Sequence, residues 1–216
     1  MSTFATAGTD VRARSTSAIL GQVLFLVAVA MGFAVAGTFM GRELSEGAAR
    51  ACSFAGLGML IVTWFVDAVR RGPLGIGWLC GLSLLIGLGL GPVIGYLAEV
   101  NPGAISTAAG LTALTVLGMA AAGFCFAKDT VRWMRPLSFI VLGAVAVSLI
   151  SLIFGGLGAL SPVVSIVIIL ASAGLIFVDF NYVRKHATED DVVWLATGIF
   201  VSVLNIFVSF LGFTSD

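Results

Sequence analysis

The chain has 216 residues, of which 59% are hydrophobic and only 10% carry a charge. A soluble domain carries about 25% charged residues, so this composition excludes a soluble enzyme and a disordered tail protein. Eleven basic and eleven acidic residues balance, which gives no bias toward nucleic acid or another polyanion. The three cysteines, Cys52, Cys80 and Cys125, all lie in apolar runs, and this odd number predicts neither a disulfide framework nor a zinc site.

Seven apolar runs are long enough to cross a bilayer, which takes about 20 residues as a helix. They cover approximately residues 18–40, 51–68, 74–97, 105–126, 137–154, 162–182 and 192–211. Backbone polar groups need internal partners in lipid, and no run alternates as a barrel strand does, so each run is predicted to be a helix. The predicted fold is an all-α integral membrane protein with one seven-helix domain over residues 18–216, after an N-terminal tail over residues 1–17.

The basic residues of the loops predict the orientation of these helices. With the N-terminus in the cytoplasm, nine basic residues lie in inside segments and only Arg42 and Arg50 lie outside. The nine are Arg12, Arg14, Arg70, Arg71, Lys128, Arg132, Arg135, Arg184 and Lys185. The first run is longer than the apolar core of about 7 to 15 residues in a cleaved signal peptide, so it is expected to remain as the first helix. We therefore predict a multi-pass protein with a cytoplasmic N-terminus and an external C-terminus.

The third run carries glycines at a spacing of four residues. Gly87, Gly91 and Gly95 share one helix face, which lets another backbone approach closely, and Pro92 frees a carbonyl within the same helix. No P-loop lysine follows these glycines, so a phosphate-binding loop is not predicted. The expected role of this segment is helix packing.

Asp179 is an acidic residue within the sixth run. Placing a charged Asp at the middle of a membrane helix costs about 2.5 to 3.5 kcal/mol, so its side chain must face protein or water or be protonated. This makes Asp179 a candidate functional residue. The alternative is that Asp179 reaches toward Arg184 or Lys185 at the interface and forms an ordinary anchor.

Ser202 and Asn205 form a short polar stripe in the seventh run. Ser202 lies about 15 Å along this run at a rise of about 1.5 Å per residue, which is close to the bilayer midplane. Asn205 follows on the same helix face. Together with Asp179 they are candidates for an ion pathway or for pH sensing, and the alternative is that they only hydrogen-bond a neighbouring helix.

The connection at residues 184–191 contains the single histidine, His186, and three acidic residues. Thr188 followed by Asp191 predicts a capping box that begins the seventh helix, and a cation site is the alternative. No His-Glu-x-x-His motif, paired intramembrane carboxylates or serine nucleophile with a histidine in the membrane is present. We therefore expect no enzymatic activity, no metal site and no cofactor.

Several of these features occur together in one known family. Seven short-looped helices, Leu90-Gly91-Pro92 in the third, Asp179 late in the sixth and Asn205-Ile206-Phe207-Val208-Ser209 in the seventh give a chain that resembles the transmembrane Bax inhibitor motif family. The closing stretch, residues 200–216, is most similar to the bacterial YccA-type members. The resemblance implies a bacterial inner-membrane protein in which six helices form two layers of three around a central seventh.

The resemblance also implies two functions. In members of the calcium-leak type, an aspartate pair on the sixth and seventh helices gates a pH-sensitive pore. Asp179 matches the first aspartate of this pair, but Ser202 stands at the position of the second. These members also carry a basic latch residue on the second helix, whereas Arg70 and Arg71 lie just beyond the end of that helix. YccA-type members, which have a carboxylate on the sixth helix and no aspartate on the seventh, are implied to associate through the N-terminal tail with the membrane-anchored AAA protease FtsH. We therefore predict a membrane regulator or interaction partner, and the alternative is a calcium or cation leak with Asp179 as the proton-sensing carboxylate.

Overall fold

The computed structural model describes residues 3–154 and 161–215, and it describes side chains for residues 16–147 and 162–215. The long helices are α1 (Thr3–Met40), α2 (Glu46–Phe65), α3 (Gly72–Val100), α4 (Pro102–Cys125), α5 (Met134–Phe154), α6 (Ser161–Lys185) and α7 (Val192–Thr214). Short 3-10 turns, η1 (Asp67–Arg70), η2 (Val131–Trp133) and η4 (Glu189–Asp191), lie in the connections. The described residues contain no strand, which confirms the predicted all-α class.

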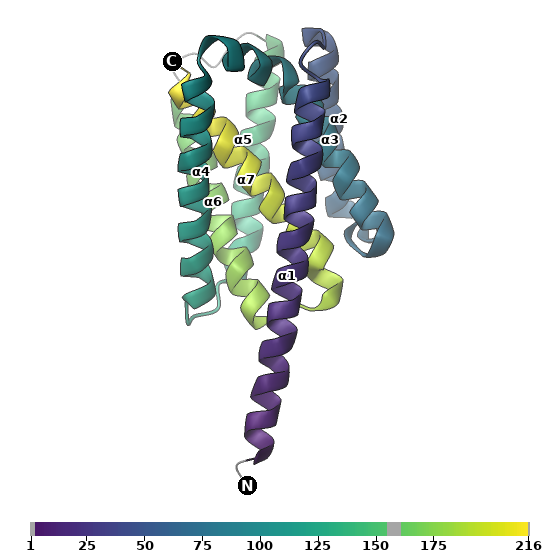
Figure 1. Ribbon diagram of the computed structural model, residues 1–216, viewed down its shortest axis with the longest axis vertical. Coiled ribbons are helices and arrows are strands. Elements are labelled where there is room, and N and C mark those ends of the chain that lie inside the picture. The colour runs from purple at the N-terminus through teal and green to yellow at the C-terminus, as the bar shows by residue number, and fades with distance from the viewer. Residues whose placement is uncertain (1–2, 155–160, 216) are drawn as a thin grey trace.

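The long helices coincide with the predicted membrane runs. Within the described residues, six are long and apolar enough to span a bilayer: α1 from Thr16, α2, α3, α4, α6 and α7. The remaining helix, α5, has 21 residues, and its last side chains lie outside the described part. The helix α1 begins at Thr3, so it continues through the segment predicted to be a separate tail and projects beyond the other helices (Figure 1).

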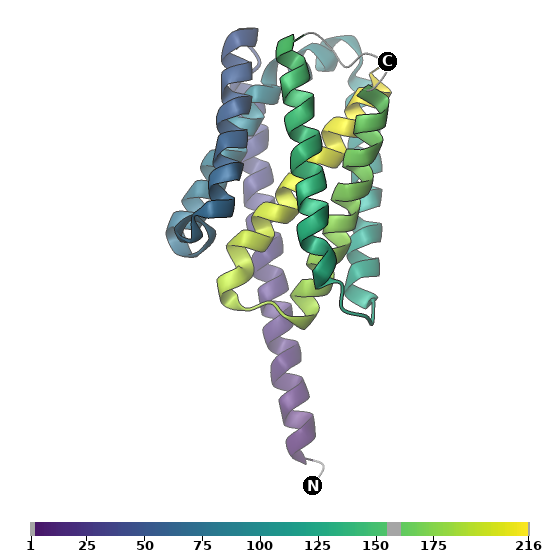
Figure 2. The same ribbon diagram turned by 180° about the vertical axis from the view of Figure 1, so that it is seen from behind.

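The helices form two groups with α7 between them. Helices α1, α2 and α3 pack together on one side, α4, α5 and α6 pack together on the other, and α7 runs obliquely between the groups (Figures 1 and 2). Buried side chains occur along α7 from Val192 to Leu211, and Phe200 and Ile206 are fully buried. The predicted arrangement of two three-helix layers around a central last helix is therefore confirmed.

One end of the bundle, which we call the basal end, carries the α2–α3, α4–α5 and α6–α7 connections. The helix α1 projects from this end, and the last turn of α7 lies at the opposite end (Figure 1). The Thr188–Asp191 capping box is present here, since both the backbone N–H and the hydroxyl of Thr188 donate to Asp191 Oδ2 at 2.9 Å. It satisfies backbone groups where the chain turns into α7.

The predicted glycine face of α3 lies against α1. A methyl group at Gly87 would overlap the carbonyl of Ala34, and one at Gly91 would overlap the backbone of Gly41. Gly95 is less crowded, because a methyl group there would lie 3.3 Å from the Arg42 side chain. The helix α3 continues through Pro92 without ending. The backbones of α1 and α3 therefore touch directly, without a layer of side chains between them.

Candidate functional site around Asp179

Asp179 lies near the basal end of α6 and its side chain is buried, with 5% of the residue exposed. A methyl group built on Gly198 of α7 would lie 3.6 Å from Asp179 Oδ2, so the carboxyl group packs against the central helix where that helix has no side chain. No hydrogen bond or ion pair of Asp179 occurs within the described residues. The site is therefore a single buried carboxyl group enclosed by two helices.

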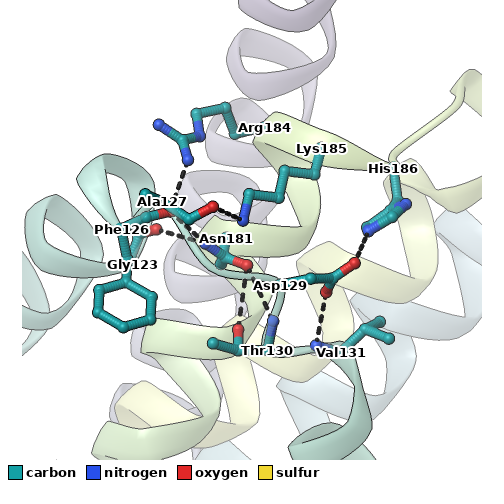
Figure 3. Close-up of polar contacts among 10 residues, drawn as sticks. All are labelled: Gly123, Phe126, Ala127, Asp129, Thr130, Val131, Asn181, Arg184, Lys185 and His186. Atoms are coloured by element: carbon teal, nitrogen blue, oxygen red, sulfur yellow. Dashed lines mark hydrogen bonds and ion pairs between the residues drawn. The ribbon is translucent and has the colours of Figure 1, made fainter.

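The two basic residues that follow Asp179 do not reach it. The guanidinium of Arg184 donates to the carbonyl oxygen of Phe126 at 2.5 Å, and the ammonium of Lys185 donates to that of Ala127 at 2.7 Å. Both acceptors lie just beyond the end of α4 (Figure 3). Arg184 and Lys185 therefore bind carbonyl oxygens of the α4–α5 connection and do not anchor Asp179.

Ser202 and Asn205 line one cavity of about 110 Å³ between α2, α5 and α7. Gly198 also lines it, as do Ser138 and Trp64, and the remaining wall is apolar. Asp179 is not part of this wall. The three predicted residues therefore lie near one another. Ser202 and Asn205 of α7 line the cavity, and Asp179 of α6 packs against Gly198, which lines the same cavity.

Two polar residues of α7, Ser202 and Asn205, lie in this cavity. Ser202 is 2% exposed, and the buried side-chain nitrogen of Asn205 has no hydrogen-bond partner within the described residues. Trp64 of α2, which lines the cavity, meets Phe139 of α5 edge to face with ring centroids 5.0 Å apart. An unpaired buried donor is unfavourable by about 1 to 3 kcal/mol, so Asn205 is a polar group that a passing or bound ligand could satisfy.

The chemistry open to this site is limited by its single carboxyl group. Ser202, which stands where the resemblance implies a second acidic residue, carries no charge, and the described residues contain no group of three or more His, Cys, Asp or Glu side chains that could hold a metal ion. One isolated carboxyl can take up and release a proton, but it cannot share one with a neighbouring carboxylate.

Asn181, two residues after Asp179, is a residue to which the sequence analysis gave no role. It is 1% exposed, and its side-chain oxygen accepts hydrogen bonds from the backbone N–H of Thr130 at 3.3 Å and from its hydroxyl at 3.1 Å. Its side-chain nitrogen donates to the carbonyls of Gly123 at 3.1 Å and Phe126 at 3.0 Å (Figure 3). Asn181 therefore ties the basal end of α6, and with it Asp179, to the end of α4.

A second link joins the same connections on the surface. Asp129 accepts a hydrogen bond from the backbone N–H of Val131 at 2.9 Å and contacts His186 Nε2 at 2.6 Å (Figure 3). The bond from Val131 lowers the pKa of the Asp129 carboxyl below its ordinary value of 3.8, and the hydrogen bond and charge of His186 lower it further. The ionised form of Asp129 is therefore the one that holds the α4–α5 connection to the α6–α7 connection.

We expect Asp129 to stabilise the protein only while it is ionised. Because its pKa is lower in the folded than in the unfolded protein, its stabilisation is complete above the ordinary pKa of 3.8 and is lost as the pH falls below that value. The melting temperature of the parent protein should exceed that of Asp129→Asn near neutral pH, and the difference should shrink as the pH falls below 3.8. Glu189→Gln, at an exposed carboxylate of the same end, is the control. A difference that persists unchanged in acid would contradict this role.

The comparison with known proteins assigns the chain to a family. The family model described as inhibitor of apoptosis-promoting Bax1 matches residues 16–215, which includes every membrane-spanning helix. No curated protein matches the chain. Because the match covers nearly the full length and the fold has the expected two layers around α7, the chain belongs to the Bax inhibitor-1 family.

Proposed function

We propose that this protein is a non-enzymatic membrane regulator that acts by binding another membrane complex, with the membrane-anchored AAA protease FtsH as the candidate partner. The observation that carries the proposal is the projection of α1 beyond the bundle, where none of the other described helices lies beside it (Figures 1 and 2). A helix that extends past its neighbours can be bound by a partner without disturbing the core. The resemblance to YccA-type members points to the same segment.

The charges support a cytoplasmic position for this projecting segment. Apart from Arg42 and Arg50, the described basic side chains lie in the connections of the basal end or in the helix turns beside them, and α1 projects from this end. Basic residues are enriched on the cytoplasmic side of membrane proteins. This favours a bacterial inner-membrane protein with α1 pointing into the cytoplasm and the end of α7 outside.

The regulator proposal predicts that removing the projecting turns abolishes binding to the protease. Full-length protein and a variant lacking residues 3–15 would be purified from membranes that contain FtsH, and FtsH would be quantified in each eluate. FtsH should accompany the full-length chain and be lost with the deletion, whereas Asp179→Asn, which leaves α1 intact, should retain it. Equal recovery with the deletion variant, or no FtsH with either protein, would refute the proposal.

A pH-dependent cation leak is a second candidate function. It is favoured by the packing of Asp179 against Gly198, beside the cavity that Ser202 and Asn205 line. Protonation of a carboxyl in this position removes a charge at the central helix, which would change how α6 and α7 pack. Because no second carboxylate faces Asp179 among the described residues, any such response depends on this one group.

The leak candidate predicts calcium flux from proteoliposomes that changes between acid and neutral pH. In Asp179→Asn the flux should lose this pH dependence, because the amide does not titrate over this range. Glu99→Gln, which changes an exposed carboxyl at the end of α3, should behave as the parent protein does. Flux no greater than that of empty vesicles at every pH would rule out the leak.

A further inference from the structure

A polar cavity of about 200 Å³ lies at the basal end, separate from the site around Asp179. It is lined by Asp67, Arg70 and Arg71 from the α2–α3 connection, by Tyr182 and Trp194 from α6 and α7, and by Asp190 from the α6–α7 connection. The apolar spans α3, α6 and α7 begin or end at this level. The cavity therefore lies where the hydrocarbon of a bilayer gives way to lipid headgroups.

Three of the five charges at this cavity, those of Asp67, Arg70 and Asp191, are already bound within the protein. Arg70 donates through Nε to the carbonyl of Thr63 at 2.5 Å and through a second nitrogen to Asp67 at 3.2 Å, and it also donates to the carbonyl of Trp64. Arg70 thus satisfies the carbonyls at the end of α2. Asp191, which also lines the cavity, accepts the two hydrogen bonds of the capping box.

Two charges of opposite sign are left over. The side chains of Arg71 and Asp190 are exposed, and neither forms a hydrogen bond or ion pair with any residue of the described chain. Both line the same cavity. An anion alone would pair with Arg71 but would be repelled by Asp190 and its acidic neighbours, and a cation alone would leave Arg71 unpaired. The best match is a ligand that carries one charge of each sign.

The aromatic residues of the cavity indicate that this ligand comes from the membrane. Tyr182 and Trp194 meet edge to face with ring centroids 5.8 Å apart, and they provide an apolar wall between the two free charges and the core. Tyr and Trp prefer the headgroup level of a bilayer, because their rings are apolar at one end and polar at the other. A ligand there has an apolar part that continues into the lipid.

We propose that this cavity binds the headgroup of a zwitterionic phospholipid, with its phosphate on the Arg71 guanidinium and its ammonium on the Asp190 carboxylate. A primary ammonium donates a charge-assisted hydrogen bond to a carboxylate, which a quaternary ammonium cannot do. Phosphatidylethanolamine is therefore the preferred lipid. A phosphate accepts from the planar guanidinium in the same charge-assisted way.

The test measures lipid binding to the full-length protein in mild detergent by native mass spectrometry. Phosphatidylethanolamine, phosphatidylcholine and phosphatidylglycerol with identical acyl chains would be compared. Phosphatidylethanolamine should bind most tightly, and Arg71→Gln and Asp190→Asn should each weaken it by about tenfold, as expected for the loss of one hydrogen bond to a charged group. Arg132→Gln and Glu189→Gln remove charges of the same end that do not line the cavity, and they should leave binding unchanged.

Three results would overturn the proposal. The first is binding of phosphatidylglycerol or phosphatidylcholine as tight as that of phosphatidylethanolamine. The second is a preference for phosphatidylethanolamine that survives in Asp190→Asn, provided that this variant melts at the parent temperature. The third is competition by soluble glycerophosphoethanolamine at the concentration at which the diacyl lipid binds, because this would assign the cavity to a soluble ligand.

Discussion

Replacing Gly87 by alanine is expected to destabilise the bundle by about 3 kcal/mol, the upper end of the usual range for an overpacked core position. The added methyl group would overlap the carbonyl of Ala34, which is backbone and cannot rotate away. The two helices must therefore separate, and the direct packing of α1 on α3 is lost along the neighbouring contact of Gly91 with Gly41. Unfolding in mild detergent, followed by circular dichroism, measures the change.

The matched control is Gly81→Ala in the same helix. A methyl group at Gly81 would lie 3.7 Å from the Cε atom of Met59, which is an ordinary contact with a flexible side chain. Because alanine favours a helix over glycine by up to about 1 kcal/mol, this variant should be as stable as the parent or slightly more stable. Equal destabilisation by the two substitutions would show that the contact with α1 is not what makes Gly87 sensitive.

Replacing Asn181 by alanine is the other change with a large expected effect, about 3 kcal/mol. The substitution removes four hydrogen bonds and leaves the backbone N–H and the hydroxyl of the buried residue Thr130 without the acceptor they share. Leaving a buried polar group unpaired is more unfavourable than losing an average hydrogen bond. Equilibrium unfolding measures the loss, and amide hydrogen exchange should become faster in the α4–α5 connection.

Asn205→Ala provides the comparison, because it removes the same functional group from another membrane helix. The side-chain nitrogen of Asn205 is buried and has no partner in the part of the chain that the structure describes, so its removal should change the stability by less than about 1 kcal/mol or increase it. If Asn205→Ala were as unstable as Asn181→Ala, the hydrogen bonds of Asn181 would not explain the effect. If neither variant were destabilised, the tie between α4 and α6 would carry little of the stability.

Most of the fold could be predicted because a bilayer imposes a simple requirement on the chain. Each span must be a run of apolar residues that satisfies its own backbone, so runs such as 162–182 and 192–211 are visible in the sequence. Helix ends are harder to predict. The second run was expected to continue to residue 68, whereas α2 ends at Phe65 because Arg70 folds back onto the carbonyls of Thr63 and Trp64.

The surroundings of the candidate site were less predictable than its central residue. The burial of Asp179 could be predicted because an acidic side chain in a membrane helix is unfavourable in contact with lipid and therefore faces protein or water. Its packing against Gly198 depends on how α6 and α7 cross, and the sequence does not specify this crossing. The role of Asn181 depends on Thr130, which lies 51 residues away. A polar residue at the end of an apolar helix was the available signal for Asn181, but that signal names no partner.

The direct backbone contact between α1 and α3 has a mechanical consequence. Side chains between two helices can change rotamer and allow the helices to slide, but touching backbones such as those of Gly87 and Ala34 have no such freedom. Force applied to the projecting turns of α1 is therefore transmitted to α3 rather than absorbed at their interface. An enzyme that pulls on this end would have to move two membrane helices together, so extracting α1 from the membrane would require more force than extracting a single helix.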